Sequence, residues 1–192
     1  MSANTKKQVN SGLEIVSPGK TDAYDWLQCV VTALVCSILT FIFLGRIIGV
    51  EGNSMIPTFV DRDKVIMSNL FYTPKQGDIV VLTKGSFSPE PIVKRIIALE
   101  GQTININFRT GEVWVDGILL DEPYIAEPTT SMYDMQFPLT VEKGCIFVMG
   151  DNRNRSSDSR DSRIGMVDTR CVLGKVYAII IPLSRIGWIS HG

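Results

Sequence analysis

The sequence contains a single histidine, His191, which is the second-to-last of its 192 residues. Residues near a chain end are commonly frayed, so we expect His191 to lie away from any packed site. A reaction that depends on a central histidine base therefore fits this sequence poorly. If the protein is an enzyme, another residue type must act as its base.

Cysteine is also scarce, with four residues and no pair spaced as CxxC. Cys29 and Cys36 fall in an apolar run, where cysteine behaves as a small hydrophobic residue. Cys145 and Cys171 are too far apart for a metal site of the CxxC type. They could pair in an oxidising compartment, although we favour two free thiols. We predict no bound metal ion and no cofactor.

The chain has no excess of either charge, because 19 basic and 20 acidic residues leave a formal net charge of −1. Nucleic-acid-binding domains usually carry a basic surface, so we expect no nucleic acid partner. A hydrophobic content of 45% with 20% charged residues is typical of a globular or membrane-associated protein. The length suits one domain with an anchor.

One long apolar run is present, at residues 26–45. It contains no charged residue, and its length is what a helix needs to cross about 30 Å of hydrocarbon. The run is too long and too far from the start of the chain for a cleaved signal peptide. We therefore predict one transmembrane helix after a flexible tail at residues 1–25. Basic residues flank the run on both sides, so charge does not decide its orientation.

Beyond this run the sequence predicts short strands separated by turns. Segments that are rich in β-branched residues or alternate in polarity lie at residues 65–67, 79–82, 92–99, 103–107, 112–115, 145–149 and 172–181. Prolines break the pattern at residues 86–91, and residues 121–138 predict an exposed loop. We expect a mostly β fold, either a partly closed barrel or a coiled sheet, without a helix of more than a few turns in residues 46–192.

Ser54 is the first candidate functional residue, because two chain-bending residues flank it. Gly52 can adopt a positive φ, and Pro57 fixes its own φ and restricts Ile56. Ser54 is nine positions after Gly45, so at roughly 3.3 Å per residue it lies at most about 30 Å from the end of the predicted span. The alternative is an ordinary turn serine.

Lys94 is the second candidate. On an extended strand Ile92, Lys94 and Ile96 share one face, so the amine would project from an apolar row. Burial disfavours the charged form of lysine and lowers its pKa. A neutral Lys94 could then take the proton of the Ser54 hydroxyl as a general base. The alternative is a lysine on an edge strand that extends into solvent. We expect the adjacent Arg95 to be a surface or salt-bridging residue.

The third feature is a polar segment at residues 150–163, which contains arginine, aspartate, asparagine and serine but no aromatic residue. A solvated loop is the ordinary interpretation, and the lack of aromatic residues argues against base stacking. Such a set of charges could also brace a site through charge-assisted hydrogen bonds. Ser156 or Ser159 could orient Lys94, while Asp158 and Arg160 could form a buried pair.

The segments SMIPTF, GDIVVL, VKRIIALEG and MGDNRNRSSDSR, in this order behind an N-terminal apolar run, resemble the motifs of the bacterial type I signal peptidases, in their compact Gram-positive-like form. The resemblance covers residues 50–165. It implies a β-rich catalytic domain with Ser54 as nucleophile and Lys94 as general base. It also implies that Ser156 orients the lysine, that Asp158 and Arg160 brace it, and that the backbone N–H of Ser54 binds the oxyanion.

The resemblance further implies a cellular setting. Residues 1–25 would be a cytoplasmic tail, residues 26–45 a single span of the cytoplasmic membrane, and residues 46–192 an extracytoplasmic catalytic domain. The partners would be membrane lipid and the signal peptides of exported preproteins, cleaved after small residues at positions −1 and −3. The sequence departs from the family where Gly52 replaces a serine that helps some members bind the oxyanion. Glu100 and Phe59 stand where proline and leucine are common.

Two other functions are compatible with the sequence. One is a Ser/Lys peptidase with a narrower task, such as processing a pilin or a conjugation component. The other is a membrane-tethered β scaffold or an inactive paralogue, against which the presence of both Ser54 and Lys94 argues.

Overall fold

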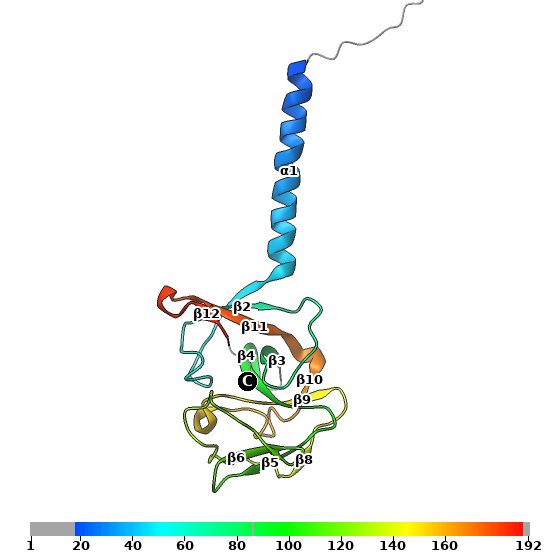
Figure 1. The fold of residues 1–192 in the computed structure, drawn as a ribbon. Helices are drawn as coiled ribbons and strands as arrows, with labels where there is room; N and C mark the ends of the chain where they lie inside the picture. Colours follow the sequence, from blue (N-terminus) through cyan, green and yellow to red (C-terminus); the bar gives the residue numbers. More distant parts are fainter. Residues whose placement is uncertain (1–17, 86, 190–192) are drawn as a thin grey trace, which may run out of the picture. The chain divides into compact units, whose positions relative to one another are not determined.

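In a computed structural model of the protein, the structure describes residues 18–85 and 87–189 (Figure 1). These residues belong to two compact units, one up to Phe41 and the other from Ile42 onward. The first contains most of one helix, and the second contains all of the strands. The predicted fold class, a mostly β protein with one N-terminal apolar helix, is confirmed. His191 and most of the predicted tail lie outside the described residues.

Helix α1 covers Pro18–Leu44, and its 27 residues span about 40 Å. Residues 18–25 are therefore helical, although the sequence analysis assigned them to a flexible tail. Proline is favoured in the first turn of a helix, where its missing N–H would have no partner, and Pro18 occupies such a position. Within the described residues, α1 is the one helix that is long and apolar enough to cross a membrane, over residues 22–40.

The larger sheet is antiparallel and has the strand order β1-β2-β11-β3-β4-β9-β10, with β12 paired to β11. The bounds of its strands are β1 Arg46–Gly49, β2 Lys64–Ser68, β3 Ile79–Lys84, β4 Ser88–Leu99, β9 Cys145–Met149, β10 Val167–Asp168, β11 Val172–Ile181 and β12 Gly187–Trp188. Three single 3-10 turns complete this unit, η1 Arg153–Arg155, η2 Thr169–Cys171 and η3 Leu183–Arg185. No α-helix occurs among the described residues after Leu44.

A second, four-stranded sheet has the order β7-β6-β5-β8. Its strands are β5 Thr103–Asn107, β6 Glu112–Val115, β7 Ile118–Leu119 and β8 Leu139–Thr140. The predicted strands at residues 103–107 and 112–115 pair as a hairpin of β5 and β6, with Ile104 opposite Val115. Apolar residues of this hairpin pack with Ile97 and Phe147 from the larger sheet. Neither sheet closes into a barrel within the described residues. Of the two predicted alternatives, the structure therefore has the coiled sheet and not the partly closed barrel.

Two strands of the larger sheet differ from the sequence expectations. Strand β1 was not predicted, because four residues next to an apolar run carry no clear period; it pairs with β2 through Ile47 and Ile66. Strand β4 begins at Ser88 and so includes both prolines of the predicted break. This end of β4 pairs only with β3, since β9 joins from Arg95 onward, and proline is tolerated where one side of a strand is unpaired.

Candidate active site

Ser54 lies in the loop of residues 50–63, which joins β1 to β2. We refer to this segment as the Ser54 loop. Gly52 has a φ of 81°, a conformation that favours glycine, and this turns the chain two residues before the serine. The loop is closed by a backbone hydrogen bond of 2.8 Å from Val50 N to Asp63 O. Met55 and Phe59 anchor it in the core, while Ser54 itself stays half-buried.

Lys94 lies in the middle of β4, opposite Val80 of β3. Only 3% of the residue is exposed, and its strand neighbours Val93 and Ile96 are also buried. The alternative of a lysine that extends from an edge strand into solvent is therefore not what the structure shows. Lys94 thus occupies a position in a central strand at which an apolar side chain is usual.

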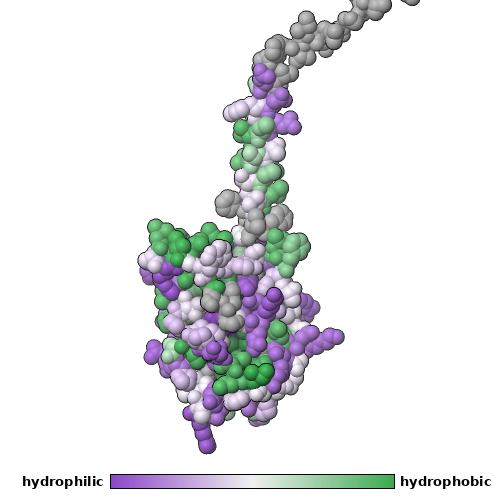
Figure 2. Space-filling model, viewed as in Figure 1, coloured by the Kyte–Doolittle hydropathy of each residue, from purple (hydrophilic) through white to green (hydrophobic). Residues whose placement is uncertain are grey.

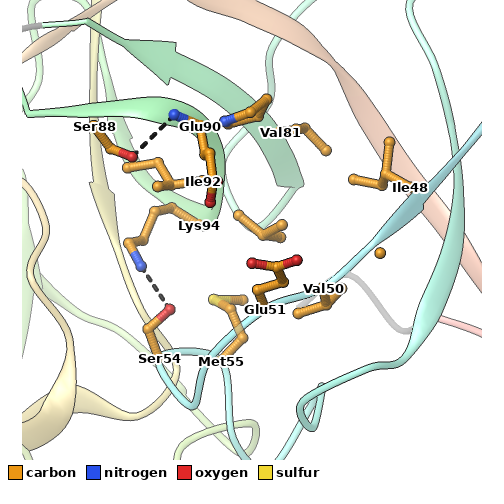
Figure 3. A pocket seen from close by; sticks show the side chains of 13 residues that line it. Ile48, Val50, Glu51, Ser54, Met55, Val81, Ser88, Glu90, Ile92 and Lys94 are labelled. Carbon is orange, nitrogen blue, oxygen red and sulfur yellow. Dashed lines mark hydrogen bonds between the residues drawn. The ribbon is translucent and has the colours of Figure 1, made fainter.

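The side chains of Ser54 and Lys94 meet directly. The Nζ atom of Lys94 and the Oγ atom of Ser54 are 2.7 Å apart and are hydrogen-bonded (Figure 3). Among the described residues, no other hydrogen-bond partner of this Nζ atom is present. Two residues forty positions apart in the sequence thus form one pair, because the Ser54 loop folds over the end of the β3–β4 ribbon.

The electrostatic surroundings of Lys94 favour its neutral form. Burial lowers the pKa of the Lys94 amine from 10.5 to about 8, against the opposing effect of the Asp158 and Asp151 carboxylates. The Arg160 guanidinium lowers this pKa slightly further. With a pKa of about 8, about a tenth of the amine is neutral at pH 7, and this fraction can accept a proton.

The segment after β9 holds the Ser54 loop through its backbone. Asn152 N donates to Ser54 O at 3.0 Å, and Asn152 Nδ2 donates to Asn53 O at 2.9 Å. A Cβ atom on Gly150 would lie 2.2 Å from Ser156 Oγ and 2.4 Å from Ser54 O. Only glycine permits this approach. The polar segment predicted to brace the site therefore contacts the Ser54 loop directly.

Asp158 and Arg160 form the buried pair that the sequence suggested. Arg160 Nε lies 2.8 Å from Asp158 Oδ1, Arg160 Nη2 lies 2.9 Å from Asp158 Oδ2, and both side chains are fully buried. Asp158 also accepts the N–H of Gly150 at 3.0 Å. The pair thus fixes the residue against which the backbone of Ser54 packs.

The two serines considered as partners of Lys94 bond elsewhere in this structure. Ser156 is buried, but its Oγ donates to Ser157 O at 3.5 Å. Ser159 Oγ accepts the N–H of Val148 at 3.0 Å, so it belongs to the pairing with β9. The orienting role of Ser156 stays a prediction, and this structure contains no hydrogen bond from it to the amine among the described residues.

The partners in two buried ion pairs were not foreseen. Arg95 is 1% exposed and bonds both carboxylate oxygens of Asp151 at 2.8 Å, so it is a buried salt-bridging residue and not a surface one. Asp151 in turn accepts the hydroxyl of Thr58. Arg153, also buried, pairs with Glu122 from the loop predicted at residues 121–138. No spacing in the sequence pointed to these pairs, which join residues 56 and 31 positions apart.

The backbone N–H of Ser54 has no hydrogen-bond partner among the described residues, so it can donate to another group. The N–H of Gly52 is occupied by Asp61 Oδ1 at 2.9 Å. Open space surrounds the position of a Cβ atom on Gly52. The site therefore offers the backbone N–H of Ser54 as a donor beside the Ser54 hydroxyl, and no side chain at position 52.

A cavity of about 430 Å³ opens beside the Ser54–Lys94 pair. Figure 3 shows the pair at one end of it and the side chains of Glu51 and Glu90 pointing into it. Its other walls are mostly aliphatic and come from β1, β3, β4 and the Ser54 loop; they include Ile48, Val50, Met55, Val81, Ile92 and Val93.

A hydroxyl held against a buried amine of lowered pKa, at one end of a cleft, is an arrangement in which the amine can take the proton of the hydroxyl. The family model of signal peptidase, peptidase S26, matches residues 23–181, which is more than half of the chain. The chain belongs to this family and is a serine endopeptidase.

Two relatives of 33% identity agree with this assignment. A signal peptidase I P of Bacillus subtilis subsp. natto is 33% identical over 177 residues, covering 87% of this chain and 94% of that protein. A probable signal peptidase I-1 of Synechocystis sp. is 33% identical and covers 85% of each chain. A solved signal peptidase I of Enterococcus faecalis V583 is 30% identical, with a TM-score of 0.47, over 54% of this chain and 97% of that one.

Proposed function

We propose that this protein is a membrane-anchored signal peptidase in which Ser54 is the nucleophile and Lys94 the general base. The observation that carries the proposal is the 2.7 Å contact between the two side chains, with the amine buried. A lysine with a pKa near 10.5 would be charged and unable to accept a proton at neutral pH. A pKa of about 8 leaves part of the Lys94 amine neutral at that pH.

The reaction then has two stages. Neutral Lys94 takes the hydroxyl proton of Ser54 as Oγ attacks the carbonyl carbon of the scissile bond, and the N–H of Ser54 stabilises the resulting oxyanion. The ammonium of Lys94 gives its proton to the leaving amine, which leaves an acyl ester on Ser54. Water, deprotonated by the same lysine, attacks that ester and releases the second product. Neither stage requires a metal ion or a cofactor.

The substrate class follows from the family and from the cleft. Signal peptides of exported preproteins would bind extended along it, with small residues at positions −1 and −3. The aliphatic walls at Ile48, Val81 and Ile92 leave room for small apolar side chains close to Ser54. The role that we infer for Asp158 and Arg160 is to hold Gly150 and thereby the backbone of Ser54.

We infer a single-pass anchor through α1, with residues 1–25 in the cytoplasm and residues 46–192 on the extracytoplasmic face of the cytoplasmic membrane. The exposed apolar side chains of α1 support a lipid environment, since a helix that is apolar all round is rarely stable in water. Figure 2 shows a second hydrophobic area over β12 and η3, where Leu183 is 81% and Trp188 85% exposed. This area would contact lipid as well.

The test uses the full chain in vesicles and a preprotein with alanine at positions −1 and −3. Cleavage at that bond should be lost in Ser54→Ala and in Lys94→Ala, while both variants unfold at the wild-type temperature. A preprotein with a bulky residue at position −1 should stay intact. Cleavage by a well-folded Ser54→Ala variant would refute the proposal.

A narrower peptidase remains distinguishable by experiment. If the enzyme processes one pilin-like or conjugation-related substrate, a panel of unrelated preproteins would remain uncut while that substrate is cleaved. An inactive scaffold would leave every member of the panel intact. Broad cleavage of the panel, lost in Ser54→Ala, is the outcome expected here.

A further inference from the structure

The Ser54 loop is held at Thr58 from two sides. The hydroxyl of Thr58 donates to Asp151 Oδ2 at 2.5 Å, and its carbonyl oxygen accepts from Arg185 Nη2 at 3.0 Å. Asp151 follows β9, whereas Arg185 belongs to η3, more than thirty residues later in the chain. Two remote segments thus meet on one residue, four positions after the proposed nucleophile.

Arg185 also bonds the end of the same loop. Its Nη1 lies 2.5 Å from Asp63 Oδ2, and the side chain of Asp63 is 1% exposed. Asp63 Oδ2 accepts the N–H of Val60 at 2.9 Å, so this carboxylate already closes the turn. The planar guanidinium therefore spans the middle and the end of the Ser54 loop, which a point charge such as an ammonium cannot do at once.

The rest of η3 makes little contact with the domain. Leu183 in η3 and Ile186 just after it are 81% and 59% exposed. The turn is formed by its own backbone hydrogen bonds, including Arg185 N to Pro182 O at 2.9 Å. The pairing of β11 with β12 places this turn, and the guanidinium of Arg185 connects it to the Ser54 loop.

We propose that Arg185 is a positioning residue that fixes the Ser54 loop so that the hydroxyl of Ser54 faces Lys94. This proposal rests on the proposed function. Without the guanidinium, the Thr58 carbonyl loses its partner and the Asp63 carboxylate keeps only the N–H of Val60. Thr58 is then held from the Asp151 side alone. We expect this loss to displace the hydroxyl of Ser54 relative to the amine, although Asn152 and the core contacts of Met55 and Phe59 still hold other parts of the loop.

The measurement is a single-turnover cleavage of a preprotein by the full chain in vesicles. Arg185→Gln should lower the rate constant by on the order of tenfold or more, because small displacements of a nucleophile have large effects on rate. Arg185→Lys should recover part of the loss, since an ammonium can reach one of the two oxygens. The pH midpoint should stay near 8, because Asp158, Asp151 and Arg160 are the charges that shift the pKa of Lys94.

A merely stabilising role would give a different result. With folded enzyme in saturating excess over the preprotein, a smaller folded fraction leaves the rate constant of the single turnover unchanged. Arg170→Gln is the control, since it removes another arginine–carboxylate pair, with Asp168, in which neither residue belongs to the Ser54 loop. It should retain the wild-type rate constant. Equal effects of Arg185→Gln and Arg170→Gln would overturn the proposal, as would a shifted pH midpoint with an unchanged rate constant.

The outcomes also separate this inference from the proposed function. Cleavage by a folded Ser54→Ala variant would refute the proposed function itself. An inactive Ser54→Ala variant together with a wild-type rate constant in Arg185→Gln would refute only the role of Arg185. If Arg185→Gln does not fold, Arg185→Lys carries the test, and a wild-type rate constant in that variant would contradict the need for a two-oxygen contact.

Discussion

Lys94 and Arg95 are adjacent on β4 and both are buried, yet the surroundings of their two charged groups differ. Arg95 meets the carboxylate of Asp151 with two hydrogen bonds and also lies over the ring of Tyr124, 3.8 Å from its centre. Lys94 meets a hydroxyl and has no carboxylate within salt-bridge distance among the described residues. The guanidinium is held as an ion, whereas burial moves the amine toward neutrality.

The same contrast separates two larger regions. Behind the site, in residues 150–163, the buried charges occur in pairs, such as Asp158 with Arg160. A buried pair costs less than a buried single charge, so this region can be polar and rigid. On the cleft side, Lys94 has aliphatic strand neighbours, namely Ile92, Val93 and Ile96. A charged group that is buried without a counterion marks a place where proton transfer is possible.

The strongest test of this contrast is to place a guanidinium, the charged group of Arg95, at position 94. Lys94→Arg keeps a positive charge but cannot supply a neutral base, because guanidinium does not lose its proton in proteins. We expect kcat to fall by about 10²–10⁴-fold, the range that general base catalysis typically provides. The measurement is preprotein cleavage by the variant, with a thermal unfolding scan to establish that it is folded. Activity within a few fold of wild type would mean that proton transfer to residue 94 is not needed.

The converse test removes the guanidinium from the paired region. The carboxylate of Asp151 is fully buried, and Arg95→Met leaves it with the hydroxyl of Thr58 as its remaining side-chain partner. Breaking one side of a buried pair should lower the free energy of unfolding by about 3–5 kcal/mol. Chemical denaturation measures this change. Arg170→Gln, which breaks an exposed pair, is the control, and it should leave the unfolding midpoint in place. Equal stability of the two variants would contradict the proposed difference between the regions.

The sequence predicted the Ser54–Lys94 pair better than it predicted the buried ion pairs. Ser54 and Lys94 stood out because their local patterns are distinctive, a serine between two chain-bending residues and a lysine in an apolar strand. Their proximity was expected from the family resemblance. The pairs of Arg95 with Asp151 and of Arg153 with Glu122 depend on which strands become neighbours, and local periodicity does not contain that information. Strand β1 was missed for a related reason, since its pairing with β2 defines it.

A third prediction concerns the ionisation of the amine. Since the neutral form of Lys94 is the base, activity should rise with pH as the proton leaves, with half of the maximum near pH 8. Between pH 6 and pH 9 the neutral fraction increases from about one hundredth to about nine tenths, so kcat/KM should increase by nearly a hundredfold. The measurement is a profile of kcat/KM against pH with a single preprotein. A profile that is flat from pH 6 to pH 10 would show that no such amine is titrating.

The smallest predicted effect links the two regions. The carboxylate of Asp158 stabilises the charged form of Lys94 and so opposes the lowering of its pKa by burial. Asp158→Asn removes that charge, while the guanidinium of Arg160 continues to act on the amine in the lowering direction. The pKa of Lys94 should therefore fall below about 8. The activity profile should move toward lower pH, so that a larger share of the maximal rate is already reached at pH 7.

The midpoint of that profile does not depend on how many molecules are folded, so any loss of stability in Asp158→Asn leaves the measurement valid. Asp168→Asn provides the matched control, because this carboxylate pairs with Arg170 and is not among the charges that shift the pKa of Lys94. Its midpoint should equal that of the wild type. A midpoint that rises in Asp158→Asn, or moves equally in both variants, would mean that the paired region supports the fold without tuning the base.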